Sequence, residues 1–158
     1  MSEADVRTIA LFFYYSLLDD QVAVRATERA LKKLSAQAPS AEDKHAASPL
    51  SVERSLLVNV CTKLWHKYEG FTVRGGSGAT PATHWRLPET LDLAPWRQFQ
   101  REGLREDMLA VVWVKILGCA ESDVAKGLGL SPGTIRYRVA RGVRQLGQTN
   151  RLGKYVGV

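Results

Sequence analysis

The feature that most constrains this chain is the stretch of residues 121–146, where two short helical patterns are separated by a single glycine. Apolar residues recur at helical spacing on both sides of Gly129, a residue type that tolerates the positive φ angle of a tight turn. The small Ala125 lies where a second helix can approach closely, and Leu130 can fill the wedge beneath the turn. Since an ordinary helical hairpin needs neither alanine nor glycine at these positions, the stretch predicts a helix-turn-helix.

The second of these helices, predicted for residues 131–146, is basic. Ser131 can cap its first turn, and Pro132 has the preset φ angle of a first helical position. One apolar stripe is expected to be buried, formed by Ile135, Val139, Val143 and Leu146. The other faces carry Arg136, Tyr137, Arg138, Arg141 and Arg144. A helix of this composition is a candidate for lying in a groove of a nucleic acid.

Positive charge gathers at the C-terminal end of the chain. Of the 22 Lys and Arg residues, seven follow Asp123, the last acidic residue, so the first 123 residues carry 15 basic and 16 acidic side chains. A positive field at one end favours a polyanionic partner, and nucleic acid is favoured over a membrane because no lipid-facing apolar helix accompanies the charge. The alternative is a solvated basic surface that binds nothing.

Three further helices are predicted in the N-terminal half. The first, residues 3–18, has one face formed by Val6, Ile9, Phe13 and Leu17. For the second, residues 21–34, the expected inner face is Val24, Thr27, Leu31 and Leu34. The third, residues 49–68 with Ser51 as N-cap, has the stripe Val52, Leu56, Val60, Leu64 and Tyr68. Residues 35–48 have no sustained period and predict a loop.

The remaining patterns complete an all-α chain. A helix is predicted to begin at Pro95, to be interrupted at Gly103 and to end at Gly118. Residues 71–94 are rich in Gly and Pro, a composition that predicts a linker. A phosphate-binding loop is not expected there, because the RGGSGAT segment lacks the Lys-Ser or Lys-Thr that such a loop needs. The expected domains are an N-terminal helical bundle (residues 1–70), this linker and a C-terminal helix-turn-helix domain (residues 95–158).

Residues 109–146 resemble region 4 of bacterial RNA polymerase sigma factors of the extracytoplasmic-function type. The pattern of that region is an apolar helix, Gly, a short helix containing Ile-Ala, then Leu-Gly-Ile/Leu, Ser-x-Gly-Thr-Val/Ile-Lys/Arg-Ser-Arg and an Arg-rich tail. It is matched here at Ser131, Gly133, Thr134, Ile135, Arg136, Arg138 and Arg141. In the family this helix reads the −35 promoter element, so the resemblance implies a DNA-binding transcription regulator.

The resemblance also implies roles along the basic helix. The residues that it assigns to DNA binding are Ser131, Thr134, Arg136, Tyr137, Arg138, Ala140, Arg141 and Arg144. Of these, Arg138 and Arg144 would neutralise the DNA backbone, and Arg136, Tyr137, Ala140 and Arg141 would face bases or their phosphates. An arginine bound bidentately to guanine discriminates between bases by ~1–3 kcal/mol. Tyr137 departs from the small residue that is usual in the family.

Residues 12–34 are similar, more weakly, to region 2 of the same family, with an aromatic helix, a Leu-Leu-Asp-Asp turn and a second helix. The family carries an acidic Glu-Asp pair that docks on the polymerase clamp, whereas this chain has Val24 and Arg25. The partner-binding residues that the resemblance implies are Asp20, Arg25, Glu28 and Arg29. Two functions are therefore expected: a divergent sigma factor that directs RNA polymerase core to promoter DNA, or a sigma-like module that binds an anti-sigma factor or other regulatory protein.

Neither catalysis nor a metal site is expected. Cys61 and His66 are five residues apart on a predicted helix and so lie on different faces, and the three His and two Cys lack metal-ligand spacing. Cys61 and Cys119 are expected to be buried free thiols in a reducing compartment. The N-terminus lacks the pattern of a targeting segment, and the apolar residues 9–18 are too few to cross a bilayer. These features predict a cytoplasmic protein without a cofactor or a membrane partner.

Overall fold

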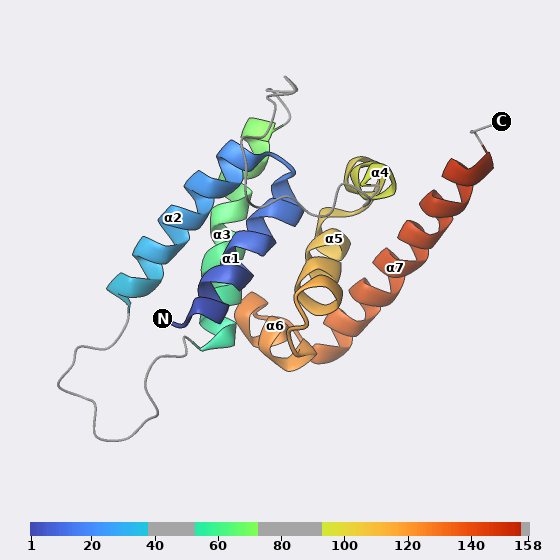
Figure 1. The fold of residues 1–158 in the computed structure, drawn as a ribbon. Helices are drawn as coiled ribbons and strands as arrows, with labels where there is room; N and C mark the ends of the chain where they lie inside the picture. Colours follow the sequence, from blue (N-terminus) through green and yellow to red (C-terminus); the bar gives the residue numbers. More distant parts are fainter. Residues whose placement is uncertain (38–52, 73–92, 156–158) are drawn as a thin grey trace.

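The computed structural model describes residues 1–37, 53–72 and 93–155, and within these ranges every regular element is a helix. The elements are α1 (Glu3–Leu17), α2 (Asp20–Ala36), α3 (Arg54–Thr72), α4 (Ala94–Glu102), α5 (Arg105–Val111), the π-helical η2 (Val112–Ile116), α6 (Glu121–Leu128) and α7 (Pro132–Tyr155). In Figure 1, α1, α2 and α3 lie side by side, and α5 lies between this bundle and α7. The predicted all-α class is confirmed.

The first two helices begin and end at local signals in the sequence. Ser2 and Asp5 form a capping box at the start of α1, in which each side chain accepts a hydrogen bond from the other residue's backbone N–H. Leu18 adopts the left-handed conformation (φ 53°) after α1. The Asp19 side chain then caps α2 by accepting a hydrogen bond from the Val22 N–H at 2.9 Å. The turn predicted at these aspartates is confirmed.

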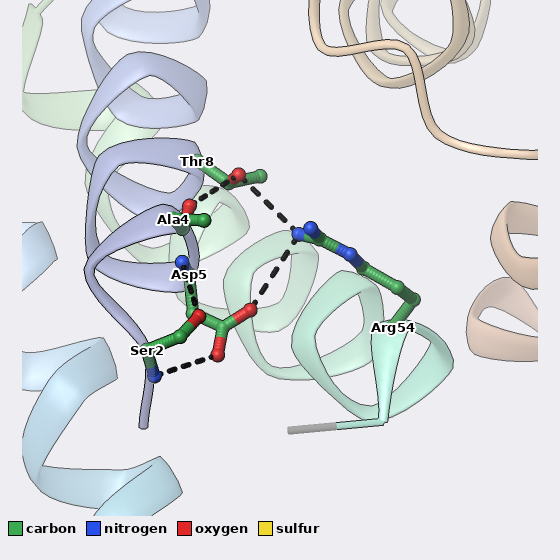
Figure 2. A network of polar contacts seen from close by, with 5 residues as sticks. All are labelled: Ser2, Ala4, Asp5, Thr8 and Arg54. Carbon is green, nitrogen blue, oxygen red and sulfur yellow. Dashed lines mark hydrogen bonds and ion pairs between the residues drawn. The ribbon is translucent and has the colours of Figure 1, made fainter. Parts of the chain in front are cut away.

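The first turn of α1 is joined to the first turn of α3 (Figure 2). The Asp5 carboxylate is buried, and its Oδ1 atom lies 3.7 Å from Nη1 of Arg54. The same Nη1 atom donates a hydrogen bond to Oγ1 of Thr8 at 3.3 Å. A buried carboxylate is tolerated where charge and hydrogen-bond donors compensate its lost hydration. This network aligns two helices that are far apart in the sequence.

α2 packs on the bundle through small side chains. Its buried residues are Ala23, Ala26, Ala30 and Leu34. The predicted inner face was wrong at Val24, which is 52% exposed, and Thr27 and Leu31 are only partly buried. The three alanines lie at helical spacing one position before the predicted stripe, and their short side chains let α2 approach its neighbours closely.

The helices of the N-terminal and C-terminal parts share one hydrophobic core. α6 lies against α3, where the Asn59 side-chain amide donates a hydrogen bond to the Gly127 carbonyl oxygen at 2.8 Å. A Cβ atom on Gly127 would lie 2.5 Å from the Ser55 carbonyl oxygen and 2.7 Å from Val58 Cβ. Since both distances are too short for a real side chain, only glycine allows the two helices to pack this closely.

Several predicted boundaries lie outside the described residues. The loop expected at residues 35–48 begins later, because Ser35 and Ala36 belong to α2, and residues 38–52, with the Ser51 cap, are not described. Most of the predicted linker, residues 73–92, is likewise outside the described ranges. In the C-terminal part, Pro95 lies in the first turn of α4, Gly103 follows its end, and Gly118 has the φ angle of 67° expected of a stop.

Candidate nucleic-acid interface

The helix-turn-helix is formed by α6, a turn at Gly129 and α7. Gly129 has a φ angle of 67°, and the Leu130 N–H donates to the Ala125 carbonyl oxygen at 2.9 Å, so the turn has the conformation that its glycine predicts. Ser131 Oγ accepts a hydrogen bond from the Thr134 N–H at 3.1 Å and lies 2.9 Å from Thr134 Oγ1. The capping role of Ser131 is confirmed, and its hydroxyl is occupied at the helix start.

The buried stripe of α7 differs from the predicted one in its second half. Ile135 and Val139 are buried as expected, and Leu146 is partly buried, but the prediction was wrong for Val143, which is 44% exposed. Steps of four residues drift around a 3.6-residue helix, so the contact passes to Gly142, where a Cβ atom would lie 2.8 Å from Val111 Cγ2 of α5. Glycine at this position lets α7 cross α5 at close range.

Four of the predicted DNA-binding residues lie on the open side of α7: Arg136, Tyr137, Ala140 and Arg144. We call this set the reading face. Tyr137 is 62% exposed, and the Arg136 side chain is 73% exposed although its Nε and Nη2 atoms both lie 3.1 Å from Glu121 Oε2 of α6. An exposed ion pair of this kind contributes little to stability, so the Arg136 guanidinium remains available to an anionic ligand.

The two other predicted arginines are directed towards α5 instead. Arg141 donates two hydrogen bonds to the fully buried carboxylate of Asp107, with Nη2 to Oδ1 at 2.9 Å. This bonding raises the pKa of Arg141 above its ordinary value. Arg138 lies 3.8 Å from Glu106, with its side chain mostly covered. Both therefore hold α7 against the start of α5, and Arg141 is not free to swing into a groove without leaving a buried carboxylate unpaired.

Asp107 is a residue that the sequence interpretation missed. It stands 34 positions from its partner and directly precedes an apolar buried run, Met108 to Val112. One signal in the sequence could have identified it: Asp107 is four residues before Val111 and so lies on the buried face of the same helix. A buried acid needs a cation or several hydrogen-bond donors as partners. A basic helix elsewhere in the chain was the obvious source of that cation.

The partner-binding set predicted on α2 is on its solvent side. Asp20, Arg25, Glu28 and Arg29 are all exposed. Arg29 Nη1 donates a 3.5 Å hydrogen bond to the Tyr68 hydroxyl of α3, and the exposed Val24 adjoins Arg25 in the sequence. The four residues are thus accessible together on one helix, with mixed charge.

The structure does not bring together the residues considered for catalysis or for metal binding. Cys61 is buried and His66, on the same helix, is exposed, with its Nδ1 atom 3.7 Å from Glu69. Within the described ranges no group of three or more His, Cys, Asp or Glu residues could hold a metal ion. Nor is any helix of those ranges both long and apolar enough to cross a membrane.

Comparison with known proteins supports the fold. No protein-family model matches this chain, and neither does any curated protein sequence. Among solved structures, the chain is similar to the sigma factor RpoE from Bartonella quintana, crystallised with the anti-sigma factor NepR, with a TM-score of 0.66 and 19% identity. The match covers 93% of this chain and 92% of that one. The resemblance to sigma factors that the sequence suggests therefore extends to the three-dimensional fold of both halves.

Proposed function

We propose that this protein is a DNA-binding transcription regulator of the sigma-factor type, which directs RNA polymerase to promoters by reading a −35-like element with α7. The observation that carries the proposal is the reading face, an exposed surface with two arginines on a helix whose other side packs on α5 and α6 through the buried Ile135 and Val139 and the Asp107–Arg141 pair. A recognition helix needs this combination, because the side chains that contact bases must project from a rigid support.

The proposed mechanism is non-covalent and requires no cofactor. Each arginine that neutralises a phosphate releases counterions, which supplies affinity that depends on salt, while bidentate contact with a guanine edge supplies sequence preference. The last acidic residue is Asp123, so the sequence from α7 onward adds no negative charge that would repel the DNA backbone.

The test is to measure binding to promoter-like duplexes by fluorescence anisotropy at several salt concentrations. Arg136→Ala is expected to weaken binding and to flatten the salt slope by about one unit if the side chain contacts a phosphate. Arg7→Ala, on the exposed side of α1, is the charge-matched control and should leave both quantities unchanged. Wild-type affinity and slope in both Arg136→Ala and Arg144→Ala would contradict the proposal.

RNA polymerase core is the proposed partner of the exposed α2 residues Asp20, Arg25, Glu28 and Arg29. The proposal treats residues 1–70 and 95–158 as two functional domains joined by residues 71–94, acting in the cytoplasm where polymerase and promoters are found. Co-purification with polymerase core tests this docking. A charge-reversed α2, with Asp20→Lys and Glu28→Lys, removes the two acidic side chains of this set and should lower recovery of polymerase while leaving DNA binding unchanged.

The second candidate function is a sigma-like module that binds an anti-sigma factor or another regulatory protein. Two observations favour it: the similar RpoE structure contains an anti-sigma factor, and Val24 and Arg25 replace the acidic pair of the family. A pull-down separates the candidates. Such a module should recover a regulatory protein but not polymerase, and it should fail to bind promoter duplexes at moderate salt.

A further inference from the structure

Asp107 fixes the position of one arginine on α7. Its side chain is fully buried in the first turn of α5, and it accepts both hydrogen bonds of the Arg141 guanidinium. A bidentate pair has a defined plane as well as a defined distance, so the guanidinium has little rotational freedom. Arg141 therefore lies where α5 holds it, although it belongs to the helix proposed to enter DNA.

The positioned guanidinium in turn lies over an aromatic ring. The Cζ atom of Arg141 is 5.1 Å from the centroid of the Tyr137 ring, one helical turn earlier. This is within the range of a cation–π interaction, and the i, i+4 spacing keeps the two side chains adjacent. Because one face of the ring is covered in this way, Tyr137 is restrained while 62% of the residue still faces solvent.

The exposed part of Tyr137 belongs to an apolar spot within the reading face. Ala140, three residues later, is also exposed, and the two are flanked by Arg136 and Arg144. The arginines provide the charge that phosphates need. In the major groove, the feature that an apolar side chain recognises is the C5-methyl group of thymine, which no other base displays.

We infer that Tyr137 is a specificity-determining residue that contacts the C5-methyl group of a thymine, and that Asp107 is a positioning residue that orients the Tyr137 ring through Arg141. The inference rests on the proposed function, since it requires α7 to enter a major groove. It assigns a role to the one position of the basic helix that departs from the family pattern.

The experiment begins with the full-length protein and a pool of randomised duplexes, from which a preferred sequence is selected. Each thymine of that sequence is then replaced in turn by deoxyuridine, which differs only in lacking the C5-methyl group. Wild-type protein is expected to bind about fourfold more weakly when one particular thymine is replaced, the loss typical of one methyl contact. The quantity compared between variants is the ratio of the affinity for the thymine duplex to the affinity for the deoxyuridine duplex. Tyr137→Ser should reduce this ratio to one, and Tyr137→Phe should preserve it.

The positioning role of Asp107 is tested by the same ratio. Asp107→Asn should lower the ratio at the same thymine, and the double variant with Tyr137→Ser should lose nothing further. Glu102→Gln removes an equal charge from an exposed position of α4 that does not contact α7 through an ion pair in the described residues, and it should leave the ratio unchanged. If Asp107→Asn does not fold, Arg141→Lys replaces it, because lysine keeps the charge but cannot form the planar bidentate pair.

The possible results test the proposed function, the role of Tyr137 and the role of Asp107 separately. A wild-type protein that selects no preferred duplex overturns the proposed function. A preferred duplex without a methyl-dependent thymine, or a ratio that survives in Tyr137→Ser, overturns the specificity assignment alone. A purely structural role of Asp107 predicts equal weakening on thymine and deoxyuridine duplexes, and that result would overturn its assignment as a positioning residue.

Discussion

The ring of Phe12 in α1 stacks on the indole of Trp113 in η2, with centroids 4.2 Å apart and ring planes inclined by 16°. Both side chains are fully buried, and the Trp113 indole N–H donates a hydrogen bond to Thr62 Oγ1 of α3 at 3.3 Å. An aromatic side chain of the C-terminal part is therefore enclosed by two helices of the N-terminal part. The two parts of the chain depend on one another for their core.

We expect Phe12→Ala to destabilise the protein by about 3–5 kcal/mol, because it removes a large buried ring and leaves a cavity against Trp113. The unfolding transition should remain single, with tryptophan fluorescence and far-UV circular dichroism changing together in urea. Val24→Ala, at an exposed position of α2, is the control and should change stability by less than about 0.5 kcal/mol. Two separate transitions in the wild type would show that the core is not shared.

Gly127→Ala is expected to destabilise by about 1–3 kcal/mol, because the new Cβ atom meets the backbone of α3 at Ser55. Gly147→Ala is the matched control, since it adds the same methyl group to a helix position with nothing within 4 Å. That variant should gain up to roughly 1 kcal/mol from helix propensity. Equal effects of the two substitutions in chemical denaturation would rule out the close α3–α6 contact.

Burial raises the pKa of both cysteine thiols, Cys61 and Cys119. Since the thiolate is the reactive form, both should resist alkylation by iodoacetamide near pH 8 in the folded protein and react rapidly in denaturant. Cys119, which is less deeply buried, should be modified first. Mass spectrometry over time gives the order, and rapid native labelling of Cys61 would contradict its place in the core.

The ion pair between Lys126 of α6 and Glu53, just before α3, should be visible in a titration. Hydrogen bonds from Lys126, the larger cause, and from Ser55 hold the pKa of Glu53 below its ordinary 4.5. A lowered folded-state pKa means that the pair stabilises the protein above pH 4.5 and that this contribution is lost as the pH falls through the folded value.

The measurement is an NMR titration of the Glu53 carboxyl group. In Lys126→Met its pKa should rise towards 4.5, and the stability difference from wild type should disappear in acid. Lys115→Met, at another exposed lysine, should leave the Glu53 pKa unchanged. Because both partners are exposed, the effect on stability should be small at physiological salt.

Local signals in the sequence were sufficient to predict the helix-turn-helix. Gly129, Ser131 and Pro132 act through backbone conformation and capping within a few residues, so the end of α6, the turn and the start of α7 could be placed without knowing what they pack against. The errors at Val24 and Val143 have a different origin. In both, a larger apolar residue was preferred over a neighbouring alanine or glycine that in fact makes the close contact.

Long-range pairs were beyond prediction from periodicity. The Asp107–Arg141 pair, the Asn59–Gly127 hydrogen bond and the Phe12–Trp113 stack each join segments whose relative placement depends on the complete packing of the core. For the candidate interface, the sequence identified the basic helix but not which arginines face outward. Which arginines face solvent and which face the protein depends on α5, because the buried carboxylate of Asp107 holds Arg141 against that helix.

The contact at Gly127 has a mechanical consequence. Side chains at most helix interfaces can change rotamer and so follow a small displacement, whereas at Gly127 no side chain of α6 stands between its backbone and the Ser55 carbonyl oxygen of α3. A gap of about 0.5–1 Å between such surfaces already forfeits roughly a quarter to a half of their attraction. The position of the helix-turn-helix on the N-terminal bundle therefore tolerates little displacement at this contact.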